Sequence, residues 1–509
     1  MEEIANGNIM GDIQESREKI LEDLDNAKTG KFHFKTIFIT GMGFFSDAYD
    51  LFVISAALPI IVAVFGLTGS DNIFGRTTVS IFGIGINAVS VETGLIGSMA
   101  LFGAFIGALV FGRIADKKGR RYIYGLEMSI LVVFAIVSAL SVNVTMLIIS
   151  RFILGIGIGG DYPISSTMMS EYANVKNRGK MVSSVFAMQG FGLLLGAFIG
   201  VVSIFFLPTD IAWRFMLGFG AIPAASVIYL RRKMKESPRF ALQTRNDSAE
   251  AAAVTSIIGK NYGDAIVSGG VTKNYKEDQG KGLLRKYWVT IIGTSLSWLL
   301  LDMAFYGTSI NNGFVLQHIG YGRASTIHQT VFNLAVGNAL IASLFEVPGY
   351  WVAVATIDRV GRKRLQWIGF SVMALMYLIL ALKYTTLIHS FILFLAFYGI
   401  AFLFGNLGPN TTTFILPTEL FPTRIRTTGH GIAASTGKLG AGIFTFLVPV
   451  LLVTMDVSGV LYILFGIAMM GSIVTMLTIR ETRGKSLEES SSLPEKRGRY
   501  SSFSPDSKR

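Results

Sequence analysis

The sequence predicts an all-α membrane protein with twelve transmembrane helices in two pseudo-symmetric six-helix halves. Three observations lead to this fold class: the composition, the number of long apolar segments, and a repeat between the two halves. Of the 509 residues, 51% are hydrophobic and only 15% are charged, and the mean hydropathy is +0.53. Soluble domains carry about 25% charged residues, so this balance is typical of a chain that lies in a lipid bilayer.

Apolar segments of the roughly 17–25 residues needed to cross a bilayer recur along almost the whole chain. We expect spans near residues 36–65, 93–112, 122–141, 146–169, 181–206, 213–231, 287–310, 328–355, 365–383, 389–416, 429–454 and 459–479. No cleavable signal is expected, because residues 1–30 are polar and acidic, so the first span would act as the insertion signal.

These spans divide the chain into five parts. We expect a cytoplasmic N-terminal segment, a six-helix bundle, a cytoplasmic central loop, a second six-helix bundle and a cytoplasmic tail, at residues 1–35, 36–231, 232–285, 286–480 and 481–509. The tail is rich in Ser, Lys and Arg, and this composition predicts that it is disordered.

Lys and Arg are distributed unequally between the loops that alternate along the chain. Loops 112–121, 170–180, 356–364 and 417–428 hold fourteen of them, whereas the loops of the opposite set hold two. Basic loops stay on the cytoplasmic side, so both termini and the central loop are predicted to be cytoplasmic. The net charge of +12 follows from this bias, which disfavours nucleic acid as a partner.

Metal and thiol chemistry are also disfavoured. The chain has no cysteine, which excludes disulfides and thiolate metal sites. No pair of its five histidines has metal-ligand spacing, which favours surface positions for them and predicts that the protein holds no metal.

The two halves repeat each other. "GRIADKKGRR" at 112–121 follows the second span, and "TIDRVGRKR" at 356–364 follows the eighth. An acid and an arginine seven residues apart also recur, Glu171 with Arg178 and Glu419 with Arg426, at an offset of 248 residues for both members. Internal repeats of this size are typical of secondary transporters.

With its "GxxADxxGRR" loop, the chain resembles the major facilitator superfamily from about residue 36 to 489. The resemblance implies the major facilitator fold and a set of charged residues that latch the cytoplasmic helix ends together in one state. Plain positive-inside charge is the alternative for this loop. The predicted gating residues are Asp116, Gly119, Arg120, Arg121, Glu171, Arg178, Asp358, Arg362, Glu419 and Arg426.

Polar side chains inside the spans are candidate functional residues, because each is costly to hold in hydrocarbon. They are Asp47, Asp50, Asp161, Tyr162, Gln189, Asp302, Asn410 and Lys438. At ~1.5 Å per residue, all lie roughly 10–22 Å from the cytoplasmic end of their span. Trp298, Asp302 and Tyr306 share one helical face by their spacing of four, and Asp47 and Asp50 are predicted to share another.

Equivalent places in the two halves carry these polar groups. Asp161 lies 28 residues before Gln189, and Asn410 lies 28 residues before Lys438. Glycine and proline interrupt both helices involved, and such paired interruptions indicate a binding site in transporters. The alternative is a set of internal ion pairs, in which Lys438 neutralises one aspartate and Arg151 another.

The motif "GGDYP" followed by "SE", together with "MQGFG", "WxxxDxxxYG", "GPN" and "GK", resembles the phosphate:proton symporter family. The resemblance implies proton coupling by Asp47, Asp50 and Asp161. It implies a phosphate pocket formed by Tyr162, Gln189, Trp298, Asp302, Tyr306, Asn410 and Lys438. Dihydrogen phosphate carries P–OH groups that can donate a hydrogen bond to a carboxylate such as Asp302. Sulfate has no such donor, so the site would reject it.

The sequence therefore predicts a secondary active transporter of the cell membrane that imports inorganic phosphate with protons by alternating access. We expect it to need no cofactor and to function as a monomer. Two alternatives remain: a major facilitator carrier for a sugar or an organic ion, and a phosphate-sensing receptor that signals through residues 232–285 or the tail. An enzyme is disfavoured, because the sequence shows no nucleophile–base pair, P-loop or metal cluster.

Overall fold

The computed structural model describes residues 18–67, 72–81, 84–245 and 278–493. Within them, eleven helical segments are long and apolar enough to cross a membrane. The last, Thr423–Thr478, contains two spans, because Asp456 has φ 62° and ψ 170° and divides the long helix α21 (Arg426–Thr478). The described residues thus form twelve spans, in the order that the sequence predicts.

The first six spans form the N-terminal half. They are α2 (Lys31–Val64), α3 (Ala88–Lys118), α4 (Arg120–Ile123) with α5 (Leu126–Ala139), α6 (Val144–Tyr172), α7 (Arg178–Phe206), and α8 (Thr209–Phe219) with α9 (Ala221–Arg232). Between α2 and α3, the strands β1 (Thr78–Ile81) and β2 (Ile84–Asn87) pair antiparallel in the connecting loop.

The C-terminal half repeats this plan. Its helices are α13 (Trp288–Ser309), α14 (Asn312–His318), α15 (Ile327–Ile341), η4 (Ala342–Glu346), α16 (Val347–Val360), α17 (Arg362–Leu382), α18 (Tyr384–Leu387), α19 (Phe391–Gly405), η5 (Asn406–Asn410), α20 (Thr411–Leu420), η6 (Thr423–Ile425) and α21. The segments η4 and η5 are π-helical turns inside two spans. Pro348 and Pro409 adjoin or lie in them, and a proline removes the N–H that would continue the α-helical hydrogen bonds.

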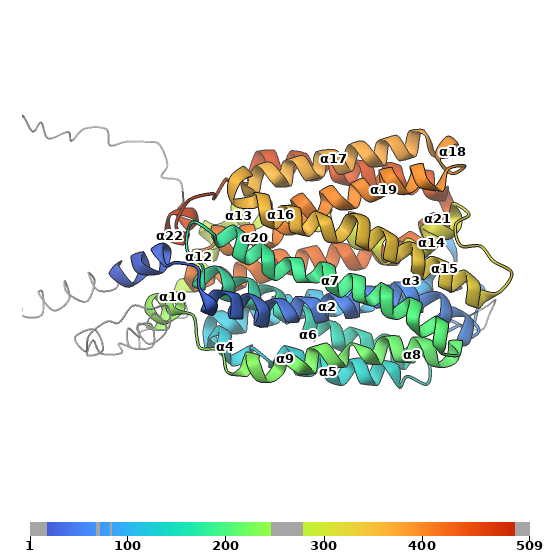
Figure 1. Ribbon diagram of the computed structural model, residues 1–509, viewed down its shortest axis with the longest axis horizontal. Helices are drawn as coiled ribbons and strands as arrows, with labels where there is room; N and C mark the ends of the chain where they lie inside the picture. The colour runs from blue at the N-terminus through green and yellow to red at the C-terminus, as the bar shows by residue number, and fades with distance from the viewer. Residues whose placement is uncertain (1–17, 68–71, 82–83, 246–277, 494–509) are drawn as a thin grey trace, which may run out of the picture.

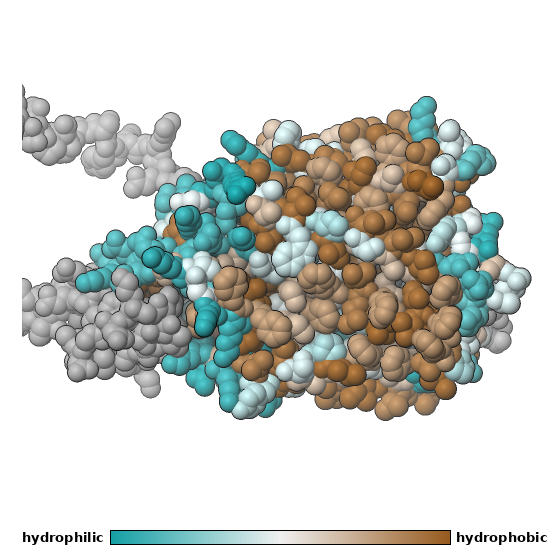
Figure 2. Space-filling model, in the orientation of Figure 1, coloured by the Kyte–Doolittle hydropathy of each residue, from teal (hydrophilic) through white to brown (hydrophobic). Residues whose placement is uncertain are grey.

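The spans run side by side along the long axis of the molecule (Figure 1). The short helices α10 (Pro238–Phe240), α12 (Asp278–Lys286) and α22 (Leu487–Ser491) lie at one end, and α14 and α18 lie at the other. Figure 2 shows a broad hydrophobic surface along the middle of the molecule, with hydrophilic residues gathered at both ends. This is the surface of a chain surrounded by hydrocarbon at its waist.

Several helices continue past the predicted ends of their spans. The second span was expected to end at residue 112, but α3 continues to Lys118, so most of the marker loop is helical. Gly119 follows it with φ 100° and ψ 152°, and Gly361 follows α16 with φ 101° and ψ 157°. Only glycine adopts such angles readily. The repeat in the sequence therefore reflects a repeat of backbone geometry.

The prediction that the tail is disordered is wrong for residues 481–493, and residues 494–509 lie outside the described part of the chain. The Glu481 carboxylate accepts hydrogen bonds from the backbone N–H groups of Arg362 (3.0 Å) and Lys363 (3.2 Å). Arg239 forms an ion pair with Glu488. The charged residues that predicted disorder instead bind the ends of helices on the side where α10, α12 and α22 lie.

The contact between Glu488 and Arg239 predicts how the tail responds to pH. Burial by itself would raise the pKa of Glu488, but the Arg239 guanidinium lowers it to about 2, below the ordinary 4.5. A carboxyl with a lowered pKa contributes stability above its ordinary pKa and loses it as the pH falls through the lowered value. The wild-type tail should therefore stay docked near neutral pH and detach as the pH falls from 4.5 towards 2.

We expect Glu488→Gln to free the tail at neutral pH, seen as faster motion of a spin label at Ser492→Cys. The exposed Glu489→Gln is the matched control and should leave the label immobile. Equal label mobility in wild type, Glu488→Gln and Glu489→Gln would show that Glu488 does not hold the tail in place.

Candidate functional site

The seven residues predicted to bind solute meet in one buried group between the two halves, which we call the central cluster. Tyr162 of α6 and Gln189 of α7 come from the N-terminal half, and the other five come from the C-terminal half. None is more than 1% exposed. The members of the central cluster are Tyr162, Gln189, Trp298, Asp302, Tyr306, Asn410 and Lys438.

An ion pair lies at the middle of the central cluster. Lys438 Nζ donates to Asp302 Oδ2 at 2.9 Å, and both side chains are almost fully buried. The same Nζ lies 4.0 Å from the ring centroid of Tyr306 and 4.4 Å from that of Tyr162. The ammonium group is therefore held by one carboxylate oxygen and two aromatic faces, which attract a cation.

A chain of polar side chains joins the two halves around this pair. The hydroxyls of Tyr162 and Tyr306 lie 3.0 Å apart, and the Tyr162 hydroxyl donates to Gln189 Oε1 at 3.4 Å. The Tyr350 hydroxyl of α16 accepts from Gln189 Nε2 at 2.9 Å and from Asn410 Nδ2 at 2.8 Å. Tyr350 was not predicted, although a tyrosine inside a span is a visible signal.

The expectation that histidines are surface residues is wrong for His33 and His430, which are 1% and 0% exposed. The His430 ring packs edge-on against Trp298, with centroids 5.3 Å apart, and its Nε2 lies 3.0 Å from the Phe414 carbonyl oxygen. His430 precedes Lys438 by eight residues, so both lie on one face of α21. That spacing could have placed His430 beside the site.

Of the three aspartates predicted for proton coupling, Asp161 has a cation partner. Arg231 Nη1 and Nη2 donate to its two carboxylate oxygens at 2.7 and 2.8 Å, and Arg231 Nη1 also donates to Glu127 at 2.9 Å. Gly43 makes room for this group, because a Cβ there would overlap the guanidinium. Glu127 and Arg231 were not predicted, and a glutamate inside the third span was the available signal.

Asp47 and Asp50 interact electrostatically with each other, but their other neighbours differ. Their carboxylates are buried and accept no hydrogen bond in the described residues. Asp47 interacts electrostatically with Asp161 and Lys438, whereas Asp50 lies against Gly220 at the junction of α8 and α9. Residues three apart differ by about 60° around a helix axis, so both carboxylates stay on one side of α2 while their nearest neighbours differ.

Arg151 also adjoins Asp50, as the ion-pair alternative suggested. However, Arg151 Nη2 donates to the backbone oxygen of Asp50 at 2.7 Å, not to its carboxylate.

Ion pairs join the two halves at the end of the molecule that the sequence predicts to be cytoplasmic. Glu171 pairs with Arg120 of its own half at 3.3 Å and with Arg426 of the other half at 2.8 Å. The equivalent residue of the C-terminal half, Glu419, pairs with Arg362 of its own half and with Arg178 of the other half, both at 2.9 Å. We call this set the cytoplasmic gate.

Two aspartates of the predicted gate cap helices of the opposite half. Asp116 accepts from the backbone N–H groups of Thr427 (3.3 Å) and Thr428 (2.6 Å) at the start of α21. Asp358 accepts from Gly179 (3.1 Å) and Lys180 (2.7 Å) at the start of α7. A negative charge is favourable at a helix N-terminus, so each aspartate fastens one half to the other.

Two other predicted gate residues lie beside this network. The Arg121 side chain is exposed, and its backbone N–H donates to Glu236 at 3.3 Å. A Cβ at Gly119 would overlap the same Glu236 carboxylate.

Comparisons with known proteins show the family and the fold of the chain. The profile of the sugar (and other) transporter family matches residues 36–493. The chain belongs to this family. Inorganic phosphate transporter 1-6 of Oryza sativa subsp. japonica is 36% identical over 94% of the chain and 96% of its own length. Probable inorganic phosphate transporter 1-6 of Arabidopsis thaliana is 37% identical over 93% and 96%.

The resemblance seen in the sequence is therefore confirmed, and the protein is a multi-pass membrane transporter. Among solved structures, the proton:xylose symporter XylE of the major facilitator superfamily aligns with a TM-score of 0.73 at 20% identity, covering 91% of this chain and 99% of that one. This likeness confirms the major facilitator fold.

If the ion pairs of the cytoplasmic gate hold the two halves together, a variant that removes one of the carboxylates should change the conformation of the transporter. Glu419→Gln removes the one carboxylate that pairs with Arg178 among the described residues and leaves Arg362 with Asp358 alone. Loss of a buried ion-pair partner costs the closed state about 3–5 kcal/mol. We expect the transporter to shift towards a state that is open to the cytoplasm.

The chain has no cysteine, so spin labels at Lys118→Cys and Arg364→Cys can report the distance between the halves without background. The distance distribution should lengthen in Glu419→Gln and stay unchanged in the exposed Glu489→Gln. An unchanged distribution in Glu419→Gln would show that these ion pairs do not hold the halves together.

Proposed function

We propose that this transporter imports inorganic phosphate together with protons across the cell membrane by alternating access, with both termini in the cytoplasm. The observation that carries the proposal is the composition of the central cluster. Among the described residues, Lys438 is its one cation, and tyrosine, tryptophan, asparagine and glutamine donors surround it. A fixed cation with several neutral donors is suited to a small oxyanion.

Asp302 supplies the selectivity in this proposal. Phosphate enters beside the Lys438–Asp302 pair, places a charged oxygen on Lys438 and donates a P–OH group to Asp302. Sulfate has no such proton and would meet the carboxylate as an unpaired like charge. The relatives named inorganic phosphate transporters support phosphate as the solute.

Asp47 is the group that exchanges the coupled proton in this proposal. Its carboxylate is buried, accepts no hydrogen bond and lies near Asp161, whose own charge is matched by Arg231. An unmatched carboxyl in such surroundings is held neutral by a proton. Proton and phosphate would then drive transport by binding one state more tightly than the other.

The alternative solutes fit the central cluster less well. A sugar is neutral and needs no fixed cation, and an organic cation would be repelled by Lys438. A receptor without transport would also use the same pocket, so uptake is the measurement that separates these functions.

Uptake of labelled phosphate into proteoliposomes tests the proposal, with proton and sodium gradients imposed separately and sulfate as competitor. We expect an inward proton gradient to drive accumulation and sulfate to compete weakly. Accumulation driven by sodium alone, or no phosphate uptake at all, would contradict the proposal.

In the same assay, Asp302→Asn should weaken phosphate uptake and lower the phosphate-over-sulfate selectivity by at least about ten-fold, or ~1.4 kcal/mol. The exposed Asp210→Asn is the control and should behave as wild type. Wild-type selectivity in Asp302→Asn would remove Asp302 from the recognition of the P–OH group.

Variants of Asp47 and Asp161 should distinguish an effect on proton coupling from an effect on the stability of the fold. Asp47→Asn and Asp161→Asn are both expected to exchange phosphate without acid-driven accumulation. Only Asp161→Asn should also lower thermal stability, because Arg231 loses its two-oxygen partner, at a cost of about 3–5 kcal/mol. Full acid-driven accumulation by either variant would exclude that residue from proton coupling.

A further inference from the structure

Glu346 is a buried acid that the proposed phosphate site does not use. It ends the π-helical turn η4 in the eighth span and is 1% exposed. Tyr350, which belongs to the polar chain around the central cluster, follows one helical turn later towards the cytoplasm. Glu346 therefore lies on the outward side of the central cluster.

The described residues place no cation against this carboxyl. Its one side-chain hydrogen bond comes from Ser309 Oγ of α13, at 3.4 Å from Oε1. The titratable groups that face it are Tyr350 of α16, Tyr377 of α17 and Tyr398 of α19. From α2, α7, α14 and α15, the neighbouring side chains are uncharged.

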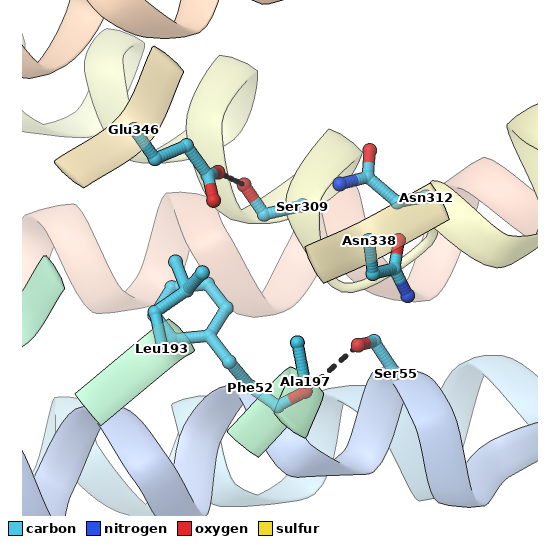
Figure 3. Close-up of a pocket in the computed structure, with 8 residues that line it drawn as sticks. All are labelled: Phe52, Ser55, Leu193, Ala197, Ser309, Asn312, Asn338 and Glu346. Carbon is cyan, nitrogen blue, oxygen red and sulfur yellow. Dashed lines mark hydrogen bonds between the residues drawn. The ribbon is translucent and has the colours of Figure 1, made fainter. Parts of the chain in front are cut away.

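Glu346 also lines a small cavity between the two halves (Figure 3). The cavity volume is about 20 Å³, which is room for about one water molecule. The C-terminal half supplies Ser309, Asn312, Asn338 and Glu346, and the N-terminal half supplies Phe52, Ser55, Leu193 and Ala197. The side-chain amide of Asn338 is buried and has no hydrogen-bond partner among the described residues, so the cavity wall holds unused polar groups.

One aromatic pair joins this cavity to the central cluster. The Phe52 ring stacks on Tyr306 with centroids 5.3 Å apart and an angle of 14° between the rings. Phe52 lines the cavity, and Tyr306 lies against Lys438. Movement of α2 away from α13 would therefore open the cavity and uncover the central cluster together.

From this placement we propose that Glu346 is a second proton-binding site, which takes up a proton from the outer solution as the two halves close around the cavity. An ionised carboxylate without a cation partner is costly to bury, so closure over Glu346 favours the carboxylic acid. When the halves separate, water reaches the group and stabilises the carboxylate, which returns the proton to the solution.

The consequence is a link between outer pH and the outward gate. The closed state binds one proton more than the open state at this position, so a lower outer pH favours closure. This inference rests on the proposed proton symport and adds a group to it. Asp47 lies among charged residues of the N-terminal half, whereas Glu346 lies in the C-terminal half and senses whether the halves have closed.

The test compares wild type with Glu346→Gln, which keeps the shape of the protonated acid and cannot titrate. Apparent KM for phosphate is measured in proteoliposomes over about two pH units around neutrality and is expressed as the concentration of dihydrogen phosphate, so that the changing share of that species does not enter the result. If closure takes up one proton at Glu346, this proton makes the wild-type KM rise by up to about ten-fold more per pH unit than the KM of Glu346→Gln. The plot of KM against pH should therefore be flatter in the variant. Glu346→Asp keeps an acid and should restore the steeper dependence.

Ser343→Ala is the matched control, because Ser343 lies on the exposed side of the same π-helical turn. It should keep the wild-type pH dependence. Phosphate exchange at equal pH on both sides, which needs no net proton movement, should persist in Glu346→Gln and shows that the variant is folded.

The outcomes separate this inference from the function on which it rests. Wild-type pH dependence in Glu346→Gln, with exchange intact, overturns the role of Glu346 and leaves phosphate symport standing. A change that follows sodium concentration at constant pH also overturns it, because the group would then bind a metal cation. Wild-type protein that exchanges no phosphate overturns both.

Discussion

The ion pair between Lys438 and Asp302 is the interaction on which the proposed transport cycle depends. Both side chains are buried between the halves, so neither charge can be left without a partner. Burying such a pair costs nearly as much as the attraction returns, so the two groups can part when each one gains a new partner. An anion that supplies both a negative oxygen and a hydroxyl donor can enter between the two groups and match each of them.

The cost of burying a charge without a partner also explains why the two ends of the molecule differ. The end that the sequence predicts to be cytoplasmic is held by carboxylates that each bind one arginine from each half, and by aspartates that cap helices of the opposite half. On the outward side of the central cluster, closure rests on aromatic and aliphatic contacts such as Phe52 on Tyr306, with one unpaired acid beside them. On the proposed mechanism, opening at the cytoplasmic gate separates charges, whereas opening at the other side hydrates the Glu346 carboxyl.

Much of this architecture could be predicted because its signals are local in the sequence. Apolar length and loop charge predict the twelve spans, and the spacing of Trp298, Asp302 and Tyr306 predicts one face of α13. The partner of Asp161 could not be predicted in this way, because Arg231 stands in a basic run that resembles a cytoplasmic loop. Its long side chain reaches back into the bundle. The tail was misjudged for a similar reason, since its charges find partners only after the helices assemble.

Solid-state NMR on bilayer-embedded protein tests the central claim most directly, by measuring the dipolar coupling between the phosphorus of bound phosphate and a ¹⁵N-labelled lysine side chain. The account predicts a strong coupling to Lys438 when phosphate is present, lost in Lys438→Met and unaffected by replacement of the exposed Lys118. Bound phosphate with no coupling to Lys438, or coupling that survives its replacement, would show that the anion binds elsewhere.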